Sequence, residues 1–151
     1  MTDKEFVEKR YELKDEEVKA YNKELCEKYP FLAYSKDDDY FGTWLDQMPD
    51  GWRIAFGIQM CEELKEELLK YDCLDEYTII EIKEKYGELR WYDGGSPRDS
   101  KVYDIIEKYS RLSEETCIVC GRPATCYTTG WISPYCRTCV GDMPHKNFNE
   151  E

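Results

Sequence analysis

The stretch CIVCGRPATCYTTGWISPYCRTC, residues 117–139, holds five of the eight cysteines in this 151-residue chain. Four of them form two C-x-x-C pairs, and fifteen residues lie between the pairs. This spacing is typical of two metal-binding turns that are joined by a hairpin. Gly121 directly follows the first pair and suits the tight reversal that such a turn needs. The four paired residues are Cys117, Cys120, Cys136 and Cys139.

Four thiolates at this spacing favour one Zn²⁺ ion in a closed tetrahedral site. Such a site has no open coordination position for water or substrate, so we expect the ion to be structural. Its binding is then expected to fold a segment that is too short and polar to form a core alone. Two disulfides and an iron centre are the alternatives. We expect neither Cys126, between the pairs, nor His145, beyond them, to be a ligand.

The expected location of the chain favours a metal over disulfides. No apolar run is long enough for a transmembrane helix, and the N-terminus lacks the apolar core of a signal peptide. We therefore expect a cytoplasmic protein. In the reducing cytoplasm, paired C-x-x-C motifs indicate metal binding.

Upstream of these cysteines, the sequence predicts an α+β fold in which helices pack on a small antiparallel hairpin, followed by a zinc-ribbon module. Residues 77–93 have the β-branched and aromatic pattern of the hairpin, with Gly87 in its turn. Ser96 is the expected N-cap of a helix that ends near Leu112.

Two further helices are predicted over residues 2–28 and 52–71, where apolar residues recur at helical spacing. We expect Cys26, Cys61 and Cys73 to lie in the core. The buried stripe of the first helix is expected to comprise Val7, Tyr11, Val18, Tyr21 and Leu25. That of the second is expected to comprise Ile54, Ile58, Cys61, Leu64 and Leu68.

The sequence therefore predicts three parts. An acidic body occupies residues 1–112, a cysteine module that binds zinc occupies residues 113–141, and residues 142–151 form a flexible tail.

The chain is strongly acidic, with 33 Asp and Glu against 21 Lys and Arg and a net charge of −12. Such a surface repels phosphate backbones, which argues against a general nucleic-acid binder. Residues 31–76 carry most of the excess, with twelve acids and four bases. A solvated helix face explains this bias, and a docking patch for a basic protein is the sharper hypothesis. The candidate partner-binding residues are Asp37, Asp38, Asp39, Glu62, Glu63, Glu66 and Glu67.

Catalytic motifs are missing from the sequence. It has no P-loop, G-x-G-x-x-G or G-x-S-x-G motif, and SPYCRTC (133–139) lacks the His-x-Glu that a zinc deaminase requires. The pattern of the metal site of some nucleases is similar to Glu81 and Lys83 with Asp72 or Asp75 upstream. An alternating, half-exposed strand explains these charges better, so we expect the protein not to be an enzyme.

Four stretches together resemble a widespread set of small phage and prophage zinc-knuckle proteins. The set has a Gly-Trp helix, a hairpin, a second helix and a zinc knuckle, and the resemblance covers roughly residues 50–139. Some members end in Cys-x-x-His, where this chain has Cys136 and Cys139. The matching stretches are GWRIAFGIQMCEELKEEL (51–68), IKEKYGELRWY (82–92), IIEKYSRLSEETCIVCG (105–121) and GWISPYC (130–136).

The resemblance and the acidity together imply a phage-encoded counter-defence protein of the host bacterial cytoplasm. In particular, the chain resembles a zinc-containing anti-CRISPR protein that inhibits a type II-A Cas9. The grooves of Cas9 are basic because they hold RNA and DNA, so an acidic surface is expected to dock there without binding DNA directly. One alternative is a zinc-ribbon adaptor for another protein or for nucleic acid. The other is a protein that sequesters or modifies a nucleotide signal through Arg90, Trp91 and Tyr92.

Overall fold

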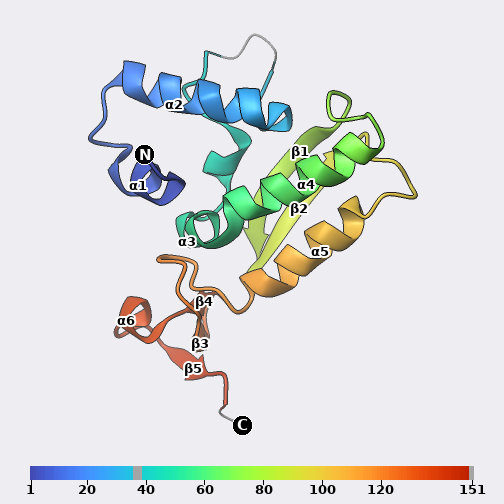
Figure 1. Ribbon diagram of the computed structural model, residues 1–151. Coiled ribbons are helices and arrows are strands. Elements are labelled where there is room, and N and C mark those ends of the chain that lie inside the picture. Colours follow the sequence, from blue (N-terminus) through green and yellow to red (C-terminus); the bar gives the residue numbers. More distant parts are fainter. Residues whose placement is uncertain (36–38, 150–151) are drawn as a thin grey trace.

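The computed structural model describes residues 1–35 and 39–149 and confirms the α+β class. A larger body, in which helices pack on a two-stranded antiparallel hairpin, is followed by a smaller cysteine-containing part at the C-terminus (Figure 1). The helices are α1 (Asp3–Lys9), α2 (Asp15–Lys28), α3 (Asp50–Trp52), α4 (Ile58–Lys70), α5 (Val102–Ser113) and α6 (Arg137–Val140). The strands are β1 (Thr78–Lys85), β2 (Glu88–Gly94), β3 (Cys126–Thr128), β4 (Pro134–Tyr135) and β5 (His145–Asn147).

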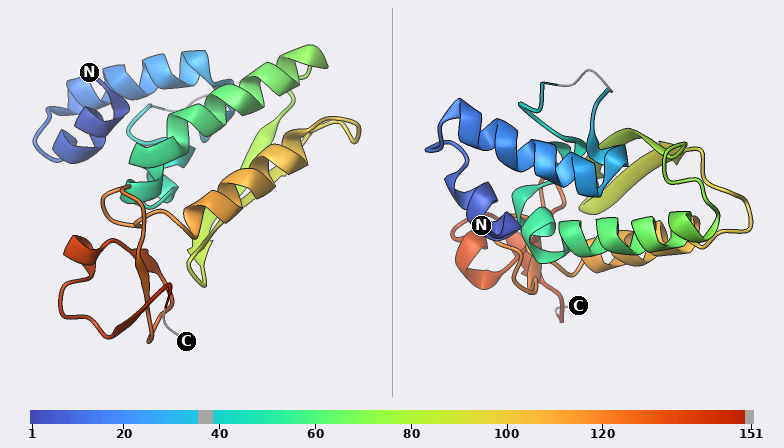
Figure 2. Two further views of the ribbon diagram at one scale, coloured as in Figure 1. Left: turned by 60° about the horizontal axis from the view of Figure 1, so that its bottom comes forward. Right: turned by 45° about the horizontal axis from the view of Figure 1, so that its top comes forward.

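The predicted hairpin is present as β1 and β2. Its two-residue turn consists of Tyr86 and Gly87. Their positive φ angles of 53° and 76° give the turn a twist that matches the twist of the two strands. A bulge between Ile79 and Glu81 shifts the register near the open end. Helices α4 and α5 run side by side over one face of the hairpin (Figure 2).

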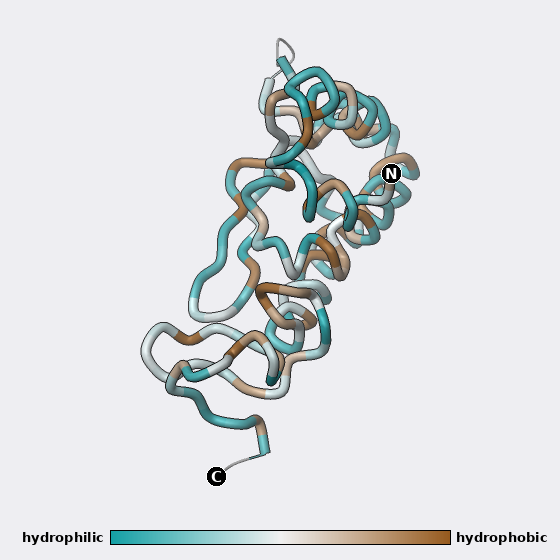
Figure 3. Tube along the Cα trace, turned by 90° about the vertical axis from the view of Figure 1, so that its left-hand side faces the viewer, coloured by the Kyte–Doolittle hydropathy of each residue, from teal (hydrophilic) through white to brown (hydrophobic). Residues whose placement is uncertain are grey.

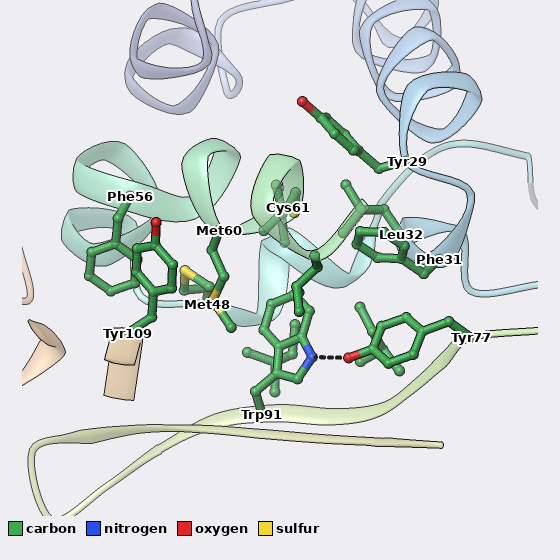
Figure 4. Close-up of a cluster of buried hydrophobic side chains, with 14 of the residues drawn as sticks. Tyr29, Phe31, Leu32, Met48, Phe56, Met60, Cys61, Tyr77, Trp91 and Tyr109 are labelled. Carbon is green, nitrogen blue, oxygen red and sulfur yellow. Dashed lines mark hydrogen bonds between the residues drawn. The ribbon is translucent and has the colours of Figure 1, made fainter. Parts of the chain in front are cut away.

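The core lies between this hairpin and the helices. Trp91 enters it from β2, and its indole N–H donates a hydrogen bond of 2.9 Å to the hydroxyl of Tyr77 (Figure 4). The Tyr77 hydroxyl in turn donates to Asp93 at 2.6 Å. The polar atoms of two large buried aromatic rings are therefore satisfied, as burial requires. Cys26 and Cys61 are buried as predicted, and Cys73 is half-buried.

The prediction of one helix over residues 2–28 is wrong, because α1 ends at Lys9 and α2 begins at Asp15. The chain leaves the helical path at Arg10, whose guanidinium bonds to Asp50 at 2.9 Å. Tyr11, expected in the buried stripe, is 86% exposed. The trace of these two helices is largely hydrophilic, with hydrophobic positions recurring along it (Figure 3).

The helix predicted over residues 52–71 is also interrupted. A π-helical turn (η3, Arg53–Gly57) separates α3 from α4. The wider turn rotates the buried face, so Phe56 is buried whereas Ile54 and Ile58 of the predicted stripe are only half-buried. Cys61, Leu64 and Leu68 of that stripe are buried as predicted.

Helix α5 begins later than predicted, at Val102, and Ser96 does not cap it. Instead the Lys101 backbone N–H donates to a carboxylate oxygen of Glu67 at 2.8 Å. The cap therefore comes from α4, a tertiary contact that local sequence does not encode. Leu112, near the predicted end of this helix, is exposed.

The segment predicted as a flexible tail contains strand β5, which pairs antiparallel with β3. Its hydrogen bonds explain why a stretch without apolar periodicity is ordered, because the Phe148 N–H donates to the Thr125 carbonyl at 3.0 Å. The small sheet has the order β4-β3-β5, and the expected hairpin between the two cysteine pairs is its β3–β4 part. Within the described part of the chain, no helix has both the length and the apolar character needed to cross a membrane.

Candidate metal centre and the acidic residues

The four cysteines of the two C-x-x-C pairs converge at one point. Their Sγ atoms all lie within 4.8 Å of one another, and those of Cys120 and Cys136 are 3.6 Å apart. All four are free thiols. Of the residues 1–35 and 39–149, these four are the one group of His, Cys, Asp and Glu side chains placed to share a metal ion.

Backbone hydrogen bonds shape both cysteine turns. In the first, the Gly121 N–H donates to the Cys117 carbonyl at 3.0 Å, and Gly121 adopts a φ of 83° as its position after the pair predicted. In the second, the Cys139 N–H donates to the Sγ of Cys136 at 3.4 Å. Each turn thereby aims two thiols at the same point.

Hydrogen bonds also set the acidity of these thiols. Burial raises the pKa of Cys136, but hydrogen bonds from the Cys139 N–H and from neighbouring thiols outweigh it and lower the pKa to about 7. Burial and the adjacent sulfur atoms raise the pKa of Cys120 and Cys139. Cys136 therefore ionises before Cys120 and Cys139, and a bound cation favours the thiolate form of such ligands.

The cluster fits a tetrahedral metal centre. Metal–sulfur bonds of about 2.3 Å place the sulfur atoms of a tetrahedral site about 3.8 Å apart, close to the 3.6 Å between Cys120 and Cys136. A disulfide requires sulfur atoms about 2.05 Å apart, which this pair does not approach. The arrangement can therefore hold a metal ion such as zinc through Cys117, Cys120, Cys136 and Cys139.

Cys126 and His145 lie outside this group of four. The Cys126 thiol is buried and donates to the Tyr135 carbonyl at 3.4 Å. His145 is exposed on β5, and its Nδ1 lies 2.7 Å from the Met143 carbonyl oxygen. Both placements agree with the expectation that neither residue is a ligand.

The first cysteine turn packs directly on α3 of the body. Gly51 lies so close to it that a Cβ there is only 2.2 Å from the Cys117 carbonyl oxygen. The Gly51 N–H donates to the Ile118 carbonyl at 2.9 Å, and the Trp52 indole N–H donates to the Thr116 carbonyl at 3.0 Å. The Gly-Trp pair of the sequence is therefore the docking point of the cysteine turn, a role that sequence reasoning missed.

The four glutamates of α4 do not form one exposed patch. Glu67 is buried and caps α5, and Glu62 accepts a hydrogen bond of 2.6 Å from the buried Tyr29. Glu63 is bonded to both Tyr109 and Lys108 of α5. Only Glu66 of this set is exposed, so most of these carboxylates hold neighbouring elements together.

The pKa values of two of these glutamates follow from their contacts. The hydrogen bond from the Lys101 backbone lowers the pKa of Glu67 and outweighs its burial. Burial acts to raise the pKa of Glu63, but the bonds from Lys108 and Tyr109 lower it. Both groups are therefore charged in the folded protein at neutral pH.

The acidic loop is placed only in part. Asp37 and Asp38 lie outside the described residues. Asp39 is exposed, and its carboxylate accepts a hydrogen bond of 3.2 Å from the Phe41 N–H. Among the predicted docking residues that the structure describes, Asp39 and Glu66 are thus the two that are exposed to solvent.

The nuclease-like charges do not assemble into a site. Glu81 and Lys83 form an exposed ion pair of 3.3 Å on β1, and neither Asp72 nor Asp75 joins them in a metal-binding group. Trp91, considered as a stacking surface for a nucleotide, is buried in the core as a hairpin residue. Its neighbour Tyr92 is exposed.

Comparison of the chain with protein-family models, with curated proteins and with solved structures finds no match.

Proposed function

We propose that the chain is a non-catalytic binding protein whose cysteine module is held by one structural Zn²⁺ ion. The observation that carries this proposal is the convergence of four thiols on one point, with no other ligand-type side chain among the described residues in that group. Zn²⁺ with four thiolates is coordinatively complete, so it supplies rigidity rather than chemistry.

The proposed partner is a basic protein of the host bacterium, and the specific candidate is a type II-A Cas9 that the chain inhibits in the cytoplasm. The charge distribution supports a basic partner. Residues 1–115 contain 30 acidic and 18 basic side chains, whereas residues 116–149 contain one acidic and three basic ones. The acidity belongs to the body, which favours association with a surface that normally holds nucleic acid.

A binding assay with the Cas9–guide complex at low and high salt tests the partner. The proposal expects binding at low salt that weakens as salt is added, because the attraction is electrostatic. Reversing the two accessible docking residues, in the double variant Asp39→Lys/Glu66→Lys, is expected to weaken binding about tenfold or more. Asp142→Lys, an exposed single charge reversal in the cysteine module, is the control for each of the two single reversals. Failure of the unaltered chain to bind at low salt refutes Cas9 as the partner.

A second candidate function is nucleic-acid binding by the cysteine module. Basic side chains outnumber acidic ones in residues 116–149, so nucleic acid is expected to bind this module rather than the acidic body. A gel-shift assay separates the two proposals, because tight, salt-sensitive DNA binding by the free chain supports this candidate and argues against the first.

A further inference from the structure

The turn of the β1–β2 hairpin meets the cysteine module directly. A Cβ on Gly87 is only 3.1 Å from the Ile132 carbonyl oxygen, in the loop between β3 and β4. One carboxylate joins the two segments. Glu84 accepts a hydrogen bond from the Gly87 N–H at 2.9 Å and also bonds to Trp131 of the loop.

Trp131 is held in one orientation on this junction. Its indole N–H lies 2.8 and 3.0 Å from the two carboxylate oxygens of Glu84. Its ring stacks on Tyr86, with centroids 5.9 Å apart and planes inclined by 17°. The side chain is nevertheless 60% exposed. The fold therefore fixes a large aromatic ring while leaving most of it in water.

Two neighbours extend this exposed apolar surface, since Tyr86 is 63% and Ile132 is 45% exposed. We call Tyr86, Trp131 and Ile132 the tip surface. Single exposed apolar side chains are ordinary, whereas apolar side chains that gather on one surface are characteristic of protein-interaction sites. Fixed aromatic rings also lose little conformational entropy on binding, which is why they dominate interface energies.

Carboxylates lie close to the hairpin turn that carries Tyr86. Glu88 follows the hairpin turn, and Glu114 follows the last residue of α5. Burial, a hydrogen bond with Glu88 and the nearby charges of Glu88 and Glu115 raise the pKa of Glu114, although Arg111 acts to lower it. A cationic group from a partner adds to the attraction that Arg90 and Arg111 already supply to these carboxylates.

We propose that the tip surface is the anchor through which the chain binds its protein partner, and that the partner offers an apolar pocket bordered by Lys or Arg side chains. This inference rests on the proposed function and adds an apolar anchor to the electrostatic contact of Asp39 and Glu66. A second copy of the chain is a poorer occupant, because a two-fold interface centred here brings the Glu88 and Glu114 carboxylates of both copies toward one interface.

The test measures binding of zinc-loaded variants to immobilised Cas9–guide complex. Trp131→Ala and Tyr86→Ser are expected to weaken binding tenfold or more, and Ile132→Lys is expected to do the same by charge repulsion. Tyr103→Ser is the matched control, because Tyr103 is a 73% exposed aromatic residue of α5 outside the tip surface. Zinc content and the unfolding midpoint identify any variant that fails to fold. Ile132→Lys changes a side chain that is 45% exposed, so it remains informative if Trp131→Ala unfolds.

Each outcome has one meaning. Loss of binding in folded tip variants, with Tyr103→Ser unchanged, supports the inference. Binding by the unaltered chain that survives in Ile132→Lys and Tyr86→Ser overturns the inference and leaves the proposed function standing. If the unaltered chain does not bind, the proposed partner and this inference fall together. Sedimentation that shows a dimer of the free chain, dissociated by Ile132→Lys, overturns the basic partner in favour of a second copy.

Discussion

Gly51 and Gly121 pack backbone against backbone, so that a Cβ on Gly121 is only 2.6 Å from the Gly51 carbonyl oxygen. These glycines belong to α3 and to the first cysteine turn, which lie far apart in the sequence. Their contact joins the body to the metal centre. The order of the cysteine turn and the position of the Gly-Trp pair therefore depend on each other.

Substitution of either glycine is expected to separate these two segments. Gly51→Ala places a methyl group against the backbone of the cysteine turn, and we expect a loss of about 2 kcal/mol in the free energy of unfolding from overpacking. Gly121→Ala adds the strain of a positive φ to the same clash. Gly130→Ala is the control, because no atom lies within 4 Å of its added Cβ. Denaturant unfolding measures the stability of the three variants. Equal stability of all three contradicts the contact.

Removal of one predicted zinc ligand is expected to remove the metal. Cys117→Ala should reduce the zinc content from about one ion per chain to a small fraction of that, since three ligands bind a structural ion much less tightly. Cys126→Ala is the control, because its thiol is buried in the same module but lies outside the cluster. Elemental analysis after dialysis decides between them. A Cys117→Ala chain that keeps its zinc is the unfavourable result.

The buried guanidinium of Arg53 is expected to make α1 an integral part of the body. Asp3 holds Arg53 with two bonds of 2.9 Å, and Asp46 holds it with one of 2.8 Å. Asp3→Asn leaves a buried charge with half of its compensation, so we expect a loss of about 3 kcal/mol. Glu5→Gln, an exposed change on the same helix, should alter stability by less than about 0.5 kcal/mol. Thermal unfolding of the two variants measures both effects. If Asp3→Asn leaves the stability unchanged, α1 does not support the core.

The carboxylate of Glu67 is expected to make stability depend on pH. Its pKa is lowered in the folded state, so its stabilising effect is present above the unfolded value of about 4.3 and is lost as the pH falls through the folded value. Glu67→Gln should therefore lose about 1 kcal/mol at pH 7, and the difference from the unaltered chain should shrink in acid. Glu66→Gln, which changes an exposed neighbour, should match the unaltered chain throughout. A difference that does not change with pH argues against this account.

The sequence was most informative where residue type and spacing act locally. Gly87 marked the hairpin turn, and the spacing of the two C-x-x-C pairs identified the four thiols that converge. It was least informative where a distant residue decides local structure. The cap of α5 is a side chain of α4, and Arg10 at the end of α1 bonds to Asp50, which is distant in the sequence.

The interpretation of the acidic helix shows the same limit. Charge counting identified Glu62, Glu63 and Glu67 as acidic side chains, but not the tyrosines and the helix end that they bond to. Likewise, Trp131 reads as part of a turn in the sequence. Its stack on Tyr86 becomes visible only when the hairpin and the cysteine module are brought together.

X-ray absorption at the zinc edge of the purified chain tests the central claim most directly, because it reports the atoms bound to the metal. The account predicts one zinc ion surrounded by about four sulfur atoms at about 2.3 Å. A shell that contains oxygen or nitrogen ligands contradicts it, since such a centre has a ligand other than the four thiols. Absence of zinc from a folded chain contradicts it as well.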